Sequence, residues 1–260
     1  MRVLVLAAVM VGIAGAASAG SIGDSAEVEV RTDNGRSLPL YPLAAGYPVR
    51  KAYAEAVKGD HYSVVIRNRL NRRIGVVVAV DGRNIISGKK SWLGNNERMY
   101  ILGPYETGEY NGWRTGADRI NRFFFTSAAD SYAASFRDRS AMGVIAVAVY
   151  PEVRRYEPWS GDSPADVYKG SSAREAAPSA RSKAESAGTG YGREEYSPSR
   201  VVAFEAEASA VEKIFLKYEW RSTLCRKGII HCGNDREPRN RMWDGDDGYA
   251  PPPGIYSRWQ

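Results

Sequence analysis

The chain has 260 residues, of which 43% are apolar and 11% aromatic, and its formal net charge is +6 at pH 7. This length and apolar content are sufficient for one well-buried core, and they exclude a chain that is disordered throughout. The basic residues are interspersed with acidic ones along the whole chain. This distribution disfavours a nucleic-acid partner, which would favour clustered basic residues.

The first nineteen residues have the order of a secretory signal. Arg2 supplies a short basic region, an apolar stretch follows from Val3 to Ala17, and Ala17-Ser18-Ala19 precedes Gly20 as a small-x-small cleavage site. An uncleaved anchor is the alternative, but the stretch is shorter than the roughly 20 residues that a spanning helix needs. We therefore expect cleavage between Ala19 and Gly20, no transmembrane segment in the mature chain, and export to the periplasm or the extracellular space.

Residues 61–80 predict a β-hairpin, because apolar side chains alternate with polar ones before a polar bend and return as a β-branched run. A second hairpin is predicted at Asp81-Gly82, with arms Val76–Val80 and Asn84–Ser87. Asp-Gly supplies the positive φ angles that a two-residue hairpin turn requires. We interpret Asp81 as structural, so that Gly82→Val should destabilise the protein whereas Asp81→Asn should have almost no effect.

Short strands continue along the chain, separated by bends that contain Gly, Pro or Asn. Residues 144–150 are apolar at nearly every position, which predicts an interior strand covered on both faces. In residues 211–220 apolar and charged side chains alternate, as in a half-buried strand. Further strands are predicted at 98–102, 109–113, 120–126 and 201–207, and one or two helical turns at 130–138. The fold class is therefore all-β: an antiparallel β-sandwich or jelly-roll-like domain with a long irregular insertion and a C-terminal tail.

Composition divides the chain into five parts. From residue 158 small and charged residues replace apolar ones, as expected of a flexible, low-complexity segment. Apolar strands return later and are expected to rejoin the first sheets, since two strands alone bury too little surface. The parts are a signal peptide (1–19), the first part of the sandwich (20–157), a linker (158–195), strands that complete the sandwich (196–233) and an irregular tail (234–260).

Cys225 and Cys232 are the only cysteines. Export favours a disulfide between them, worth about 2–3 kcal/mol for so short a loop. A metal site that includes His231 is the alternative, but adjacent ligands at 231 and 232 fit one tetrahedral ion poorly. The acidic loop residues Asp244, Asp246 and Asp247 are weak calcium candidates, because their spacing does not match that of an EF-hand.

The sequence contains no assembled catalytic motif. His61 and His231 are the only side chains with an unperturbed pKa near neutrality, and there is no G-x-S-x-G nucleophile turn. The segment 161–164, GDSP, lies in the low-complexity part, and the glycine cluster 188–192, GTGYG, lacks the strand and helix of a phosphate loop. We therefore expect no catalytic residue and no cofactor.

A carbohydrate ligand is the alternative that the sequence leaves open. Trp92, Trp113, Trp159 and Trp243 lie in or beside predicted loops, where aromatic rings stack on sugars. Closure of the sandwich ends is the competing role for Trp92 and Trp113. Paired carboxylates for glycoside hydrolysis cannot be selected from one sequence.

Five separated blocks, NRLNRRIGVVVAVDGRNIISG, GPYETGEYNGWR, FFFTSAADSYAA, MGVIAVAVYPE and GTGYGREEYSP, resemble an uncharacterised family of exported proteins of Gram-negative bacteria. The similarity covers residues 60–152 and 187–222. It implies a β-rich envelope or secreted domain and brings no activity, substrate or catalytic residue. We expect an exported, non-enzymatic protein that binds a protein or a polysaccharide, or has a structural role. The alternative is a carbohydrate-binding or carbohydrate-active protein.

Overall fold

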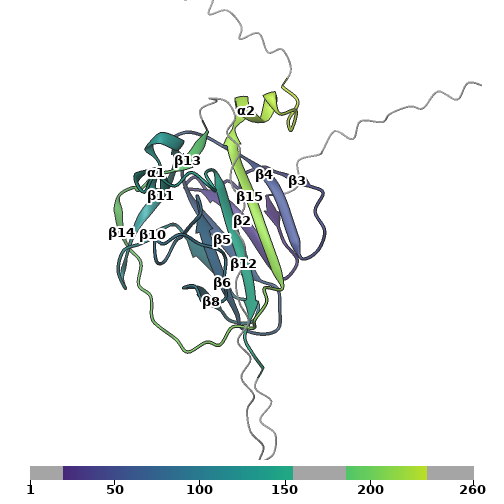
Figure 1. Cartoon of the computed structure of the whole chain (residues 1–260), viewed down its shortest axis with the longest axis vertical. Helices are drawn as coiled ribbons and strands as arrows, with labels where there is room; N and C mark the ends of the chain where they lie inside the picture. The colour runs from purple at the N-terminus through teal and green to yellow at the C-terminus, as the bar shows by residue number, and fades with distance from the viewer. Residues whose placement is uncertain (1–19, 155–185, 233–260) are drawn as a thin grey trace, which may run out of the picture.

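The structure is a computed structural model that describes residues 20–154 and 186–232, and in it two β-sheets pack face to face (Figure 1). The first sheet contains β1 (Ser21–Ile22), β2 (Ala26–Thr32), β5 (His61–Asn68), β9 (Thr107–Tyr110), β10 (Gly112–Arg114), β11 (Arg119–Ser127), β13 (Ala187–Thr189) and β14 (Glu194–Tyr196). The second contains β3 (Leu40–Leu43), β4 (Val49–Ala56), β6 (Ile74–Val80), β7 (Arg83–Asn84), β8 (Tyr100–Leu102), β12 (Val144–Pro151) and β15 (Glu212–Trp220). The predicted all-β sandwich is confirmed.

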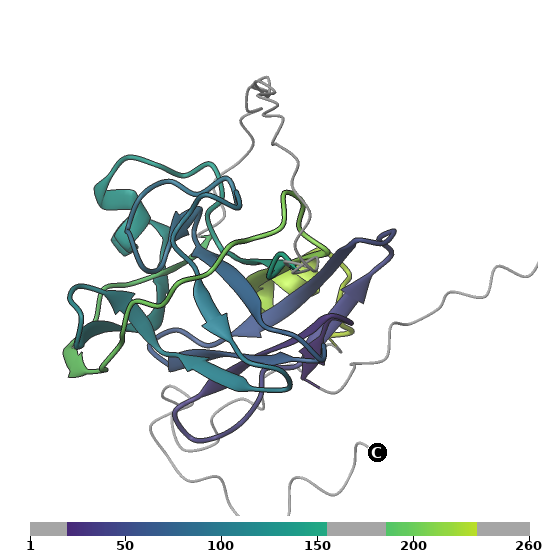
Figure 2. The same ribbon diagram turned by 90° about the horizontal axis from the view of Figure 1, so that it is seen from below.

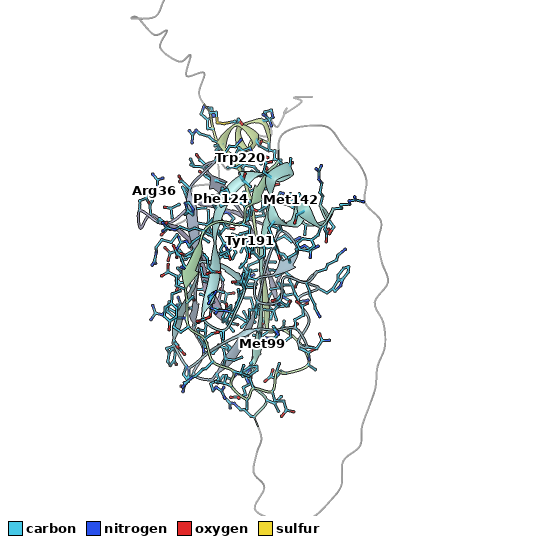
Figure 3. All side chains as sticks on the ribbon, turned by 90° about the vertical axis from the view of Figure 1, so that its left-hand side faces the viewer. Arg36, Met99, Phe124, Met142, Tyr191 and Trp220 are labelled. Atoms are coloured by element: carbon cyan, nitrogen blue, oxygen red, sulfur yellow. A yellow bond between two sulfur atoms is a disulfide. The ribbon has the colours of Figure 1, made fainter. Side chains whose placement is uncertain are left out.

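Helices are short and lie at the ends of strands. A 3₁₀ turn (Ala128–Asp130) and α1 (Tyr132–Ser135) follow β11, and α1 lies within residues 130–138, where helical turns are predicted. The other helix, α2 (Arg221–Arg226), follows β15. Figure 3 shows Trp220, at the junction of β15 and α2, at the opposite end of the sandwich from Met99, which precedes β8. No helix among the residues described here is long and apolar enough to cross a membrane.

The main core lies between the sheets. Alternate residues of each strand point inward, as the period of two dictates. Val28, Tyr62 and Phe123 come from the first sheet, and Ile214 and Leu216 from the second; each is fully buried.

A second apolar cluster covers the outer face of β6 and β12. Ala146, Ala148 and Tyr150 of β12 and Val77 of β6 pack there against Leu93. β12 pairs with β6 on one side and with β15 on the other. The prediction of an interior strand at 144–150, buried on both faces, is confirmed.

The predicted hairpin over residues 61–80 is wrong, because β5 and β6 belong to different sheets. β5 pairs with β2, β9 and β11, whereas β6 pairs with β12, β7 and β8. Residues 69–73 carry the chain from one sheet to the other. Two alternating strands joined by a polar bend have the same sequence pattern whether they pair as a hairpin or lie in different sheets. The local pattern therefore could not distinguish a hairpin from a crossover between sheets.

Two other predicted strand segments are shorter or absent. The second arm of the Asp81-Gly82 hairpin ends at Asn84, whose side-chain oxygen accepts from the N–H groups of Ile86 and Ser87 and turns the chain. Residues 201–207 form only an isolated bridge, between Ala206 and Glu152. Residues 197–211, here called the strap, cross one end of the sandwich between β14 and β15 (Figure 2).

The later strands rejoin the sandwich as expected, with two differences. β15 pairs in parallel with β4, so the second sheet is mixed, not purely antiparallel. β13 and β14 both pair with β11, so residues 187–189 and 194–195 belong to the sheet and not to the predicted linker. Their small and charged side chains suit an edge of the sheet, which composition alone does not distinguish from a linker.

Candidate functional site

The Asp81-Gly82 turn has the geometry of a two-residue hairpin. Val80 pairs with Arg83 across it, and Asp81 and Gly82 both have positive φ, 50° and 79°. Positive φ at both central residues matches the right-handed twist of the flanking strands. The predicted hairpin turn is confirmed.

The Asp81 carboxylate is 1% exposed and accepts three hydrogen bonds from distant segments. Its Oδ1 accepts from the Gly143 N–H at 2.7 Å and from the Tyr218 hydroxyl at 2.6 Å. Its Oδ2 accepts from the Thr189 N–H at 2.7 Å. Two of these donors are buried backbone groups that would otherwise lack a partner, so the carboxylate fastens β13 and the start of β12 to the turn.

The network continues across the core. Thr189 Oγ1 lies 2.7 Å from the hydroxyls of both Tyr218 and Tyr62, so β15 and β5 of opposite sheets are joined through one side chain. Burial raises the pKa of Asp81 from 3.8 to about 6, although its hydrogen bonds and the nearby Lys217 ammonium act to lower it. Because the carboxylate is enclosed, a structural role fits it better than catalysis.

The expectation that Asp81→Asn is almost silent does not fit this environment. An amide has one acceptor oxygen, so its NH₂ group would face the N–H of either Gly143 or Thr189.

An open groove lies between the strap and the strands β8 and β9. Its volume is about 1210 Å³. This exceeds the roughly 300–1,000 Å³ of a small-molecule pocket and fits a segment of an extended polymer better. The lining residues used below are Arg98, Met99, Tyr100, Glu106, Glu109, Arg114, Arg200 and Phe204.

Arg114 gives the groove a positive charge that no described carboxylate neutralises. Its guanidinium donates to the Tyr100 hydroxyl at 2.8 Å and to the Ser197 carbonyl and hydroxyl oxygens at 2.9 and 3.1 Å, all of which are neutral. These bonds also fix the strap to β10. Arg98 and Arg200 are exposed in the groove and form no ion pair with any residue in 20–154 or 186–232.

The groove also contains acidic and apolar groups. Glu106 and Glu109 are exposed on the β9 side, and Tyr100 stacks on Tyr110 with ring centroids 4.2 Å apart. Gly75 of β6 allows the apolar wall to form, because a Cβ there would lie 2.2 Å from Met99 Sδ and 2.8 Å from the Phe204 ring. The groove therefore offers charged, hydrogen-bonding and aromatic groups together.

The sequence-predicted residues do not gather at this groove. His61 opens β5 beside Phe124, and Cys225 and Cys232 form a disulfide with Cα atoms 5.6 Å apart, so the disulfide expected there is present. Trp113 is 2% exposed and packs in the core, whereas Trp92 is 74% exposed and does not close an end of the sandwich.

The remaining candidates divide between the described and undescribed residues. In the glycine cluster 188–192, Gly188 lies in β13, and a Cβ at Gly190 would lie 2.2 Å from the Phe124 ring, so these glycines serve close packing. No group of three or more His, Cys, Asp or Glu suited to a metal occurs within the described ranges. Several candidates lie outside the described residues: the signal segment 1–19, GDSP, Trp159, Trp243, Asp244, Asp246 and Asp247. Of the predicted cleavage site, Ala19 lies outside them and Gly20 is described.

The sequence did not predict the groove, because its walls come from segments far apart in the chain. The periodicity of apolar residues does not show which distant segments lie side by side.

No family model matches the chain, and comparison with curated proteins and with solved structures gave no match either.

Proposed function

We propose that this chain is an exported, non-enzymatic β-sandwich protein whose groove binds an extended polymer, protein or polysaccharide, in the cell envelope or outside the cell. The observation that carries the proposal is the groove between the strap and β8–β9, where Arg98, Arg114 and Arg200 have no carboxylate partner among the described residues. Such guanidinium groups bind carboxylates and phosphates and stack on planar groups. The secretion signal and the disulfide support export, since disulfides persist in oxidising compartments.

Fractionation of the native host and crosslinking of the full-length protein test this role. The variant Arg98→Glu/Arg200→Glu should lose the crosslinked partner, because it places two negative charges in the groove. The control Lys89→Glu/Arg139→Glu makes the same charge change at exposed positions outside the groove and should keep the partner. Equal capture by the groove variant and the wild type would overturn the proposal.

A carbohydrate-active enzyme is the second candidate, favoured by the exposed Glu106 and Glu109 in the same groove beside Tyr100. Glycoside hydrolysis uses two carboxyl groups that flank the scissile bond. A screen against peptidoglycan, polysaccharides and chromogenic glycosides separates the two functions. Turnover that Glu106→Gln or Glu109→Gln abolishes would replace the binding role with an enzymatic one, whereas binding without turnover supports the first proposal.

A further inference from the structure

The described residues cover the outer face of the second sheet over only part of its width. Residues of the 91–99 loop and of the strap cover β6 and β12. On the same face, the adjacent strands β15, β4 and β3 carry a set of side chains here called the lysine face: Tyr41, Leu43, Lys51, Tyr53, Lys213, Phe215 and Lys217.

Strand register places these residues side by side. Tyr53 lies opposite Tyr41 of β3 on one side and Lys217 of β15 on the other. Lys51 lies opposite Leu43 on β3 and opposite Phe215 on β15, and Lys213 lies two residues before Phe215 on β15. Directly opposite residues point to the same face of a sheet. Lys51 and Leu43 are exposed and the others are half-buried, while the alternate residues Ala52, Ala54, Ile214 and Leu216 are buried in the core.

Positive charge exceeds negative charge on this face. Lys51 and Lys213 form no ion pair with any described carboxylate. Lys217 and Lys227 share one carboxylate, that of Glu219, at 3.8 and 2.7 Å. The Lys227 ammonium also lies 5.2 Å from the centroid of the Tyr53 ring. The other acidic group nearby, Glu55, is paired with Arg221 at 3.1 Å.

We propose that the lysine face docks the protein on an anionic lipid surface. Lysines attract anionic headgroups without requiring a fixed geometry, and tyrosine and leucine side chains suit the region between headgroup and acyl chain. Three adjacent strands present a surface roughly 10 Å wide, at about 4.8 Å per strand spacing, which fits a planar array of headgroups. This surface shares no residue with the groove, so the two proposals are independent.

Sedimentation of the full-length protein with vesicles tests the inference. The wild type should bind vesicles made of a mixture of phosphatidylcholine and phosphatidylglycerol and should dissociate from them at high salt. It should not bind vesicles of phosphatidylcholine alone. Lys51→Glu/Lys213→Glu should weaken binding about twentyfold or more, since each lysine near an anionic membrane contributes roughly fivefold. The uncharged change Leu43→Ser should weaken binding without changing its salt dependence.

The variant Lys89→Glu/Arg139→Glu is the matched control, because it has the same net charge, lies outside both the lysine face and the groove, and should still bind the vesicles. Circular dichroism and thermal melting of each variant separate lost binding from lost folding. Three results overturn the inference: no binding by the folded wild type, equal losses in both charge-reversal variants, or lysine-dependent binding to polygalacturonate with none to vesicles. The last result would assign the face to an acidic polysaccharide.

Discussion

The Tyr218 hydroxyl donates to Asp81 Oδ1 over 2.6 Å and so joins β15 to the turn that follows β6, across 137 residues of sequence. β12 lies between these two strands, and its preceding residue Gly143 donates to the same oxygen. One carboxylate therefore sets the ends of three neighbouring strands. The turn that appears local in the sequence is a long-range junction in the fold.

Removal of this carboxylate should destabilise the protein strongly. Asp81→Ala leaves the N–H groups of Gly143 and Thr189 buried without an acceptor. At about 1–3 kcal/mol for each of the two unsatisfied groups, the free energy of unfolding should fall by about 2–6 kcal/mol in urea titrations. Asp118→Ala, at an exposed position, should change it by less than about 0.5 kcal/mol. A loss at Asp81 no larger than this control would contradict the role assigned to the junction.

Stability should also depend on pH through Asp81. Burial raises its pKa from 3.8 to about 6. Between these two pH values the carboxyl group is therefore protonated in the folded state and ionised in the unfolded state. The stabilisation from that proton is complete below pH 3.8 and is lost as pH rises through about 6; it amounts to roughly 2–3 kcal/mol.

Asp81→Asn cannot titrate at this position. Subtracting its unfolding free energy from that of the wild type at each pH isolates the Asp81 contribution from those of other groups. The difference should fall steadily between about pH 4 and pH 6. A difference that stays constant over this range, or rises, would show that the carboxylate is ionised throughout.

Gly82→Val should destabilise the hairpin turn. Gly82 has a φ of 79°, and a Cβ there would lie 3.0 Å from the Ala141 Cβ. The left-handed backbone alone costs a residue with a Cβ about 1–2 kcal/mol, so thermal denaturation should show at least this loss. Gly46→Val is the control, because no atom lies within 4 Å of its added Cβ and its φ is not in this region. Equal melting temperatures for the two variants would refute the turn assignment.

Gly75→Ala should alter the groove. The added methyl group would lie 2.2 Å from Met99 Sδ and 2.8 Å from the Phe204 ring, so both wall residues must move. We expect a loss of about 1–3 kcal/mol in unfolding free energy and weaker capture of the groove partner. Gly46→Ala adds the same methyl group in open space and should do neither. Unchanged capture by a folded Gly75→Ala protein would separate the groove from binding.

The sequence alone determined the fold class, the Asp-Gly turn and the interior position of residues 144–150. These features depend on local signals: a period of two, glycine at positive φ, and an unbroken apolar run. The same signals could not determine which strands pair. The segments 61–68 and 74–80 were expected to pair as a hairpin, yet they lie in opposite sheets.

Only the tertiary structure decided what the polar residues do. The buried carboxylate of Glu212 accepts from the N–H groups of Asp24 and Ser25, more than 180 residues away, and no motif announces this contact. No motif predicts the contact of Asp81 with Thr189 or that of Arg114 with the strap. Nor does a motif predict that the residues of the lysine face lie side by side on three strands. A hydrogen bond forms only between groups that are close in space, and the order of residues along the chain does not show which distant groups come close.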